Sequence, residues 1–451
     1  MRTKGAADVA GIGCIRAGIR RRAGGAPGVG GALMLPGAPH VAYREGELFI
    51  EGCALRALAA EHGTPLYVYS RTGMLEAVAS YQRALIGRDH LVCYAMKANS
   101  SLAVLQTFAA AGCGFDIVSS GELDRVLAVG VDASRIVFSG VGKTRAEMRQ
   151  ALDAGVMCFN VESDGELDVL SQVASQAGRT AKVSLRVNPD VDAGTHPYIS
   201  TGLKESKFGV AFADAPALYR HAATLPGIAV HGIDIHIGSQ ITELEPYREA
   251  TRKILDLVDV LGAAGIPLAH VDVGGGLGIR YRDERPVPLP DYAAMLTGLF
   301  RGRRERMVFE PGRRLVGDAG ILLTRVLYLK DGTPKRFAIV DAAMNDLLRP
   351  SLYGAWHAVD AVRPRAGAPL AWDIVGPVCE SGDFLALDRP LVLAEGDLLA
   401  VRAAGAYAMA MSSNYNARPR AAEVIVDGET MHLARRRERV DELFAAELRL
   451  P

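Results

Sequence analysis

The chain has 451 residues, of which 49% are hydrophobic and 23% charged, and these are ordinary values for folded globular domains. Lysine plus arginine equals aspartate plus glutamate, at 51 residues each, so the balance offers no general attraction to nucleic acid or to an acidic membrane surface. No apolar run is long enough to span a bilayer. The six cysteines lack CxxC pairs and metal-ligand spacing, which predicts a reducing cytoplasm, no disulfide framework and no metal site; they are Cys14, Cys53, Cys93, Cys113, Cys158 and Cys379.

Residues 1–33 differ in composition from the rest of the chain. They are rich in Gly, Ala and Arg and lack periodicity, so we expect a disordered tail, or a start of translation at Met34. An export signal around Arg20-Arg21-Arg22 is the alternative, but no apolar segment follows these arginines. Residues 34–69 are predicted to hold short strands and one helix and to contribute to a β domain; the segments are Tyr43–Ile50, Cys53–His62 and Pro65–Tyr69.

From Leu91 onward, short apolar runs alternate with amphipathic segments. The predicted strands are Leu91–Ala95, Gly114–Ile117, Ile136–Phe138, Met157–Val161, Val183–Val187, His231–His236, His270–Val273 and Met307–Glu310. The predicted helices between them include Ser101–Ala111, Gly121–Ala128, Arg145–Ala154 and Asp164–Gln176. Eight strand–helix units predict an α/β fold with a (β/α)8 TIM-type barrel, which we place at residues 70–312.

The pattern changes after Pro311. Short apolar runs are separated by Gly, Asp and Pro turns, and a helical signal returns only at Glu438–Leu448. We expect residues 313–451 to form a mostly antiparallel β-barrel domain. Its predicted strands are Ile321–Leu329, Phe337–Val340, Ala371–Val375, Asp397–Val401 and Ala422–Val426.

Polar residues stand at the ends of the predicted barrel strands, where this architecture carries its chemistry. They are Lys97, Asp116, Ser139, Asn160, Arg186, His236, Gly274-Gly275-Gly276 and Glu310. Ser139 and Asn160 are interpreted as cap or turn residues, whereas the set as a whole predicts a polar active-site mouth.

Four of these positions together describe a pyridoxal phosphate site. An apolar environment would lower the pKa of Lys97, whose neutral amine can then attack an aldehyde; the alternative is a surface lysine. The glycine run after strand seven offers backbone N–H groups to a phosphate, with Ser239 nearby. The His236 ring can stack on a flat cofactor, and Glu310 can keep a pyridine nitrogen protonated, unless it forms an ion pair with Arg313 or Arg314.

Several segments resemble the diaminopimelate decarboxylase family of alanine-racemase-like pyridoxal phosphate enzymes, from about Met34 to the C-terminus. The matching segments are Tyr94–Asn99, Phe115–Ser119, Asn188–Gly202, Lys207–Gly209, His236–Gln240, Gly274–Gly276, Glu310–Arg313 and Gly376–Asp383. The resemblance implies decarboxylation of meso-2,6-diaminopimelate to L-lysine, through an aldimine and a quinonoid, in a homodimer with composite sites.

The resemblance also implies roles for individual residues. Lys97, Cys379 and His236 would be catalytic, with Cys379 delivering the proton, although taken alone Cys379 is better interpreted as a buried structural thiol. The cofactor-binding residues would be Lys97, Asp116, Arg186, His236, Ser239, Gly275, Gly276, Glu310, Gly312, Arg313 and Tyr407. The substrate-binding residues would be Arg313, Arg349, Tyr353, Glu380 and Tyr407, where arginines bind a distal carboxylate and Glu380 the distal amine.

Three other functions stay open. A decarboxylase of the same build could act on another basic or carrier-tethered amino acid, and would differ around Arg349 and Tyr353. An amino-acid racemase would need a second base and no Cys379 loop. A non-catalytic regulator of this fold would bind a partner protein and lack Lys97 or Cys379.

Overall fold

The computed structural model describes residues 35–192 and 207–451. The predicted tail at residues 1–33 and residues 193–202 of the Asn188–Gly202 motif lie outside this described part. Pro36–Pro451 form one compact unit. No described helix is both long enough and apolar enough to cross a membrane.

Eight parallel strands close into a barrel and confirm the predicted fold class. In ring order they are β5 (His90–Ala95), β6 (Gly114–Ile117), β7 (Ile136–Phe138), β8 (Cys158–Val161), β9 (Ala181–Asn188), β11 (Ile228–Asp234), β12 (His270–Asp272) and β13 (Arg306–Phe309). Pairing of β13 with β5 and of β8 with β9 completes the ring, and β10 (Val210–Ala211) adds to the edge of β9. The strands are short apolar runs because both of their faces are buried.

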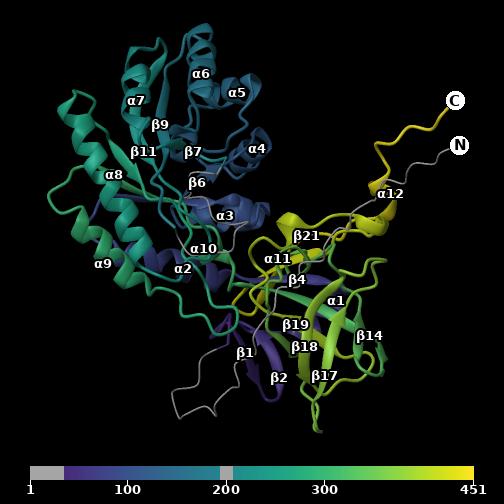
Figure 1. The fold of residues 1–451 in the computed structure, drawn as a ribbon. Coiled ribbons are helices and arrows are strands. Elements are labelled where there is room, and N and C mark those ends of the chain that lie inside the picture. The colour runs from purple at the N-terminus through teal and green to yellow at the C-terminus, as the bar shows by residue number, and fades with distance from the viewer. Residues whose placement is uncertain (1–34, 193–206) are drawn as a thin grey trace, which may run out of the picture. The chain divides into compact units, whose positions relative to one another are not determined.

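Helices follow the strands and lie outside them in Figure 1. They are α2 (Arg71–Ala84), α3 (Leu102–Ala110), α4 (Ser120–Ala128), α5 (Arg145–Ala154), α6 (Asp164–Gln176), α7 (Ala215–Thr224), α8 (Glu245–Ala263), α9 (Leu289–Leu299) and α10 (Arg313–Val316). α5 shows how local sequence sets their ends. Thr144 and Glu147 form a capping box at its start, and Gly155 takes a left-handed conformation at its end.

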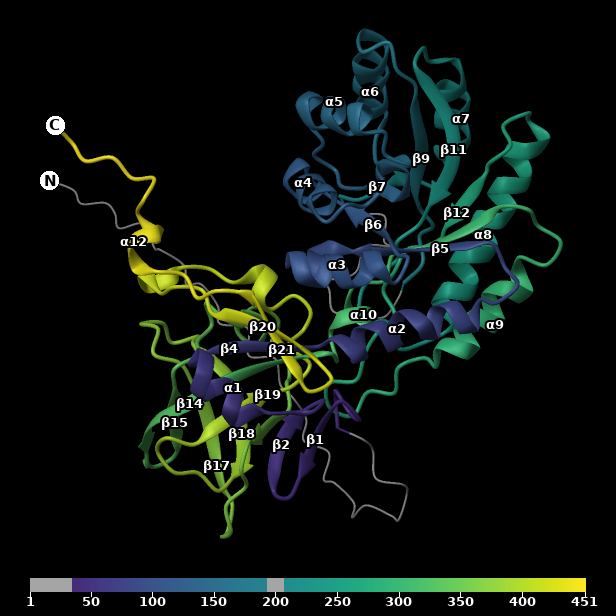
Figure 2. The same ribbon diagram turned by 180° about the vertical axis from the view of Figure 1, so that it is seen from behind.

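A second, nine-stranded sheet is built mainly from the C-terminal part of the chain. Its strands are β4 (Leu66–Ser70), β14 (Gly320–Lys330), β15 (Phe337–Val340), β16 (Val359–Ala361), β17 (Leu370–Val375), β18 (Phe384–Leu391), β19 (Leu398–Val401), β20 (Ala422–Asp427) and β21 (Thr430–Arg435). Most pairs are antiparallel; β15–β17 and β4–β20 are parallel. The early strand β4 lies between β14 and β20, and Figure 2 shows it in purple beside the yellow strands.

The N-terminal segment differs from the prediction in one respect. Tyr43–Ile50 is not one strand but a hairpin of β1 (Val41–Arg44) and β2 (Glu47–Ile50), to which β3 (Cys53–Ala54) adds a third strand before α1 (Leu55–His62). The hairpin turns at Glu45 and Gly46, which have φ angles of 49° and 80°. Two consecutive left-handed residues make the tight turn that antiparallel strands favour.

The predicted C-terminal helix is also shorter than expected. Only α12 (Val440–Leu443) is helical within Glu438–Leu448, and none of its residues is buried. A segment without an apolar face against the core lacks the packing that stabilises most protein helices. The prediction of an eleven-residue helix was therefore wrong.

Candidate active site

A cavity of ≈ 810 Å³ opens at the C-terminal ends of the barrel strands. Eleven of the predicted site residues line it: Lys97, Arg186, His236, Ser239, Gly276, Glu310, Gly312, Arg313, Arg349, Tyr353 and Tyr407. Asp116 reaches it through a bond to Lys97, and Gly275 precedes Gly276 in its wall. The C-terminal ends of the parallel strands all lie on one face of the barrel. Residues that are spread over about three hundred positions of the sequence therefore meet at this cavity.

Lys97 lies in the 3-10 turn η1 (Met96–Ala98), directly after β5. Its side chain is 39% exposed and its Nζ lies 3.2 Å from Oδ2 of Asp116. Burial acts to lower the pKa of Lys97, but attraction to Asp116, Tyr407 and Glu310 outweighs it and raises the pKa above its ordinary value. The expectation of apolar walls was wrong, because Asp116 at the end of β6 stands beside the amine.

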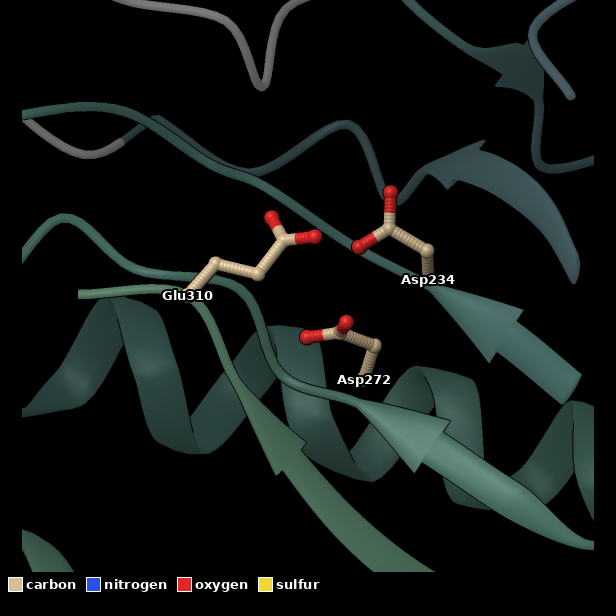
Figure 3. Close-up of side chains that lie close together, drawn as sticks. All are labelled: Asp234, Asp272 and Glu310. Atoms are coloured by element: carbon tan, nitrogen blue, oxygen red, sulfur yellow. The ribbon is translucent and has the colours of Figure 1, made fainter. Parts of the chain in front are cut away.

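Three buried carboxyl groups lie below this amine, at the ends of β11, β12 and β13. Oxygen atoms of Asp234, Asp272 and Glu310 lie within 4.8 Å of one another, and Figure 3 shows the groups facing each other. Burial raises the pKa of Asp234 to about 7. Burial and the neighbouring acids hold the pKa values of Asp272 and Glu310 well above their usual range. Like charges this close cannot all ionise, so the cluster retains protons at neutral pH.

Glu310 is further held by two side chains that the sequence suggested were caps. Its Oε1 accepts hydrogen bonds from Ser139 Oγ at 3.5 Å and from Asn160 Nδ2 at 3.3 Å. Asn160 also donates to Ser139 at 3.1 Å. The interpretation of Ser139 and Asn160 as caps was wrong, because both side chains point inward and bind the carboxylate. No ion pair joins Glu310 to Arg313 or Arg314 within residues 35–192 and 207–451.

His236 follows β11 and contacts the glycine loop after β12. Its Nδ1 accepts a hydrogen bond from the backbone N–H of Gly275 at 3.3 Å. Burial, with Arg186 and Lys97 nearby, holds the pKa of His236 well below its usual range. The ring is therefore neutral and flat, with Nδ1 fixed as an acceptor.

The glycine loop cannot carry side chains at its centre. A Cβ on Gly275 would lie 2.2 Å from the carbonyl oxygen of Glu310, and one on Gly276 would lie 2.4 Å from that of Gly238. Gly276 also has a φ angle of 98°. The loop thus packs directly against the segments that carry Glu310 and Ser239, and Gly276 lines the cavity.

Two buried arginines line the far side of the cavity, and each is 7% exposed. Arg313 donates to Tyr281 Oη at 2.6 Å and to Ser239 Oγ at 3.0 Å, while its Nε has no hydrogen-bond partner among the described residues. Arg349 donates to His357 Nε2 at 2.8 Å. Burial lowers the pKa of Arg349, and in the described part of the chain no carboxylate lies within 4.0 Å of either guanidinium. These two buried cations can therefore bind an anionic ligand in the cavity.

Cys379 and Glu380 do not line the cavity. They lie between β17 and β18, both exposed, and the Cys379 N–H donates to Asn416 Oδ1 at 2.9 Å. Within one chain these two residues are thus separate from the other predicted site residues.

Five residues at the cavity were not predicted. Tyr281 lines it, while Glu162 and Asp234 lie beside Arg186, Asp272 beside Glu310 and His357 beside Arg349. For Asp234 and Asp272 a signal existed. Each stands two residues before a predicted site residue, His236 or Gly274, and alternate residues of an extended segment share a face. Tyr281 and His357 lie in loops, where no such periodicity exists.

The described residues fit pyridoxal phosphate on the chemistry of their side chains. An amine, a buried acid, a neutral imidazole and a glycine loop beside Arg313 match its aldehyde, ring nitrogen, ring face and phosphate. The unpartnered Nε of Arg313 and the tight glycine loop are the features an anion would complete.

Comparisons with known proteins agree with this chemistry. The pyridoxal binding domain of the pyridoxal-dependent decarboxylases matches residues 72–317. The diaminopimelate decarboxylase of Pseudomonas aeruginosa is 60% identical over 409 residues, which are 91% of this chain and 99% of that protein.

Solved structures show the same similarity. Diaminopimelate decarboxylase from Helicobacter pylori, complexed with L-lysine, has a TM-score of 0.84 and 43% identity, covering 87% of this chain and 98% of that chain. The enzyme of M. jannaschii, in co-complex with L-lysine, has a TM-score of 0.88 and 36% identity, covering 93% and 99%. The similarity therefore extends over the barrel and the second sheet.

Proposed function

Because this chain belongs to the diaminopimelate decarboxylase family of pyridoxal-dependent decarboxylases, we propose that it converts meso-2,6-diaminopimelate to L-lysine and CO2, the last step of lysine biosynthesis. The observation that carries the substrate assignment is Arg349, a buried arginine that has no carboxylate partner among the described residues and is not assigned to the phosphate. A substrate with a second amino-carboxylate end supplies the missing anion, whereas a simple diamine precursor does not.

Residues of the barrel would hold the cofactor. Lys97 would bind its aldehyde, His236 would stack on its ring, and Glu310 would face its ring nitrogen. Gly275, Gly276, Gly312, Ser239 and Arg313 would surround the phosphate, and Asp116, Arg186 and Tyr407 would complete the site. When bound, pyridoxal phosphate supplies an electron-accepting ring that stabilises the carbanion left by CO2.

The two acids beside Glu310, Asp234 and Asp272, help to determine whether Glu310 carries a charge. Glu310 accepts hydrogen bonds from Ser139 and Asn160, which fix its orientation. The pKa values of Asp234 and Asp272 are both raised, so these two acids can stay protonated. Glu310 can thus ionise opposite a protonated ring nitrogen, since the other two acids need not carry full charge beside it.

Substrate binding would fall to Arg313, Arg349, Tyr353 and Tyr407 of one chain. The guanidinium carbon of Arg313 lies 4.8 Å from the centre of the Tyr407 ring. This contact links the substrate-binding residues to the cofactor-binding residues of the cavity. Cys379 would deliver the proton that replaces CO2, and Glu380 would accept from the distal ammonium.

We further propose a cytoplasmic homodimer with composite sites. Cys379 and Glu380 are exposed and outside the cavity of their own chain, which supports their contribution to the site of a partner subunit. We assign residues 34–69 and 313–451 to the sheet domain and 70–312 to the barrel, a division supported by the pairing of β4 with β14 and β20.

The test is incubation of the purified protein with meso-diaminopimelate, ornithine and lysine in turn. We expect lysine and CO2 from the first and negligible turnover of the others, because unpaired buried arginines penalise substrates that lack a second carboxylate. Comparable turnover of ornithine would overturn the substrate assignment.

Attachment of the cofactor is tested separately. The protein should show the visible absorbance of a lysine-bound pyridoxal cofactor, and Lys97→Ala should lose it with an unchanged melting transition. Borohydride should fix the cofactor to Lys97; a peptide map that places it on another lysine would contradict the assignment.

A further inference from the structure

His357 contacts Arg349 from a buried position outside the set of residues discussed so far as binding groups. It follows α11 (Arg349–Tyr353), precedes β16, and is 0% exposed. Its Nε2 lies 2.8 Å from Arg349 Nη1, and its Nδ1 lies 2.9 Å from the backbone carbonyl oxygen of Arg402. Within the described residues, His357 is the hydrogen-bond partner of the Arg349 guanidinium.

These two contacts fix the tautomer of His357. A guanidinium only donates and a carbonyl oxygen only accepts, so Nδ1 must carry the proton and Nε2 must present its lone pair. Burial, together with Arg349, lowers the pKa of His357 to about 3. The charged groups around it are Arg349, Arg313 and Arg389, all cations, which agrees with a neutral ring.

The carbonyl oxygen that orients His357 belongs to a rigid part of the second sheet. Arg402 follows β19, and its N–H donates to Ala358 O at 2.8 Å. Its side chain forms an ion pair with Asp360 and donates to the carbonyl oxygens of Pro36 and Val41 at 2.8 and 3.0 Å. The imidazole is thus held by an element that does not itself reach the cavity.

Tyr281 supports the same pair from the barrel side. Its ring meets the His357 ring edge to face at 5.2 Å, and the Arg349 guanidinium carbon lies 4.6 Å from its centre. Its hydroxyl accepts from Arg313. One Nη of Arg349 is committed to His357, which leaves its other nitrogens for a ligand in the cavity that Arg349 lines.

We infer that His357 is a positioning residue that orients Arg349 toward the distal carboxylate of the substrate, and through Arg349 sets selectivity for substrates with a second amino-carboxylate end. This inference rests on the proposed function, since it assigns the ligand of Arg349. A long arginine side chain that is not held loses rotamer entropy on binding, and a fixed one does not.

The test compares His357→Phe with the unaltered holoenzyme. Phenylalanine keeps a ring against Tyr281 but offers no lone pair to Arg349. We expect the KM for meso-diaminopimelate to rise about tenfold or more, with kcat changed by less than about threefold. The inhibition constant of L-lysine, which keeps the distal amino-carboxylate of the substrate, should rise by a similar factor. That of 1,5-diaminopentane, which has no carboxylate, should change by less than about twofold.

A double-mutant cycle separates positioning from general damage. If His357 acts through Arg349, adding His357→Phe to Arg349→Ala should raise the KM no further. His357→Gln, which returns an acceptor, should recover most of the affinity. His270→Phe is the matched control, because His270 is buried at the start of β12; it should leave the KM unchanged whatever it does to the melting temperature.

Additive effects in the cycle, or an equal loss of 1,5-diaminopentane and diaminopimelate affinity, would overturn the inference while the proposed function stands. If His357→Phe does not fold, His357→Leu, which also offers no lone pair to Arg349, takes its place in the cycle. Failure of the unaltered enzyme to decarboxylate meso-diaminopimelate would overturn the proposed function and this inference with it.

Discussion

At the scale of single residues, the acids below the cavity are the most unusual feature of the molecule. Asp234, Asp272 and Glu310 are buried, and neither oxygen of Asp234 has a hydrogen-bond partner among the described residues. The other charged groups that act on them are Asp116, Lys97, Arg186 and Glu162. Burying three carboxyl groups side by side costs stability. A role in binding a positively charged ring nitrogen explains why the fold retains them.

The raised pKa of Asp234 gives a pH-dependent prediction. Its folded pKa of about 7 lies above its ordinary value, so its contribution to stability is present below about pH 4 and is lost as the pH rises through about 7. Asp234→Asn removes this pH-dependent loss of stability, because an asparagine side chain does not titrate. The free energy of unfolding of the variant relative to the parent should therefore increase from pH 4 to pH 8, by at most about 4 kcal/mol.

Melting temperatures of both proteins across this pH range provide the measurement. Asp153→Asn, an exposed residue of α5, controls for the general effect of the substitution. A difference between Asp234→Asn and the parent that stays constant or shrinks with rising pH would show that Asp234 is ionised in the folded protein at all these pH values.

At the scale of elements, the loop between β12 and α9 depends most strictly on its residue types. Gly276→Ala would place a methyl group 2.4 Å from the carbonyl oxygen of Gly238 and 3.0 Å from Tyr247 Oη, at a φ of 98°. We expect the loop to move away from Ser239 and cofactor affinity to fall about tenfold or more, while the barrel remains folded.

Fluorescence titration of the cofactor-free protein with pyridoxal phosphate measures this affinity. Gly298→Ala in α9 is the control, because a Cβ there meets nothing within 4 Å and alanine favours a helix. Unchanged affinity in Gly276→Ala would mean that the loop does not hold the phosphate.

Elements with strong local signals could be predicted from the sequence. β7 and α5 match their predicted bounds, since an apolar run between turns and a capping box with a terminal glycine specify them locally. β18 was missed because Asp388, Arg389 and Pro390 interrupt its apolar pattern, and its pairing with β17 supplies the missing stability. The pair Glu310–Asn160 could not be predicted, because it joins strands that only the closed fold brings together. Arg349 and His357 are near in sequence, but His357 lies in an irregular segment after α11, where no periodicity predicts a contact.

At the scale of the whole molecule, the exposed position of Cys379 gives a test of the shared site. Lys97→Ala and Cys379→Ala proteins should each be nearly inactive. Mixed and allowed to exchange subunits, they should form heterodimers in which one of two sites is intact, and activity should return to about a quarter of the unaltered level if exchange is random. Demonstrated exchange without recovery would mean that Cys379 serves the cavity of its own chain.

The position of β4 has a consequence for how the protein is made. Residues 66–70 pair with residues 320–323 on one side and with residues 422–426 on the other. At about 5–20 residues per second, the last of these partners leaves the ribosome roughly 20–70 s after β4 does. Until then β4 presents an unpaired edge to the cell, although the barrel residues have already been synthesised. Residues 422–426 are thus needed before both edges of β4 are covered, and a chaperone that binds exposed strands has a long opportunity at β4.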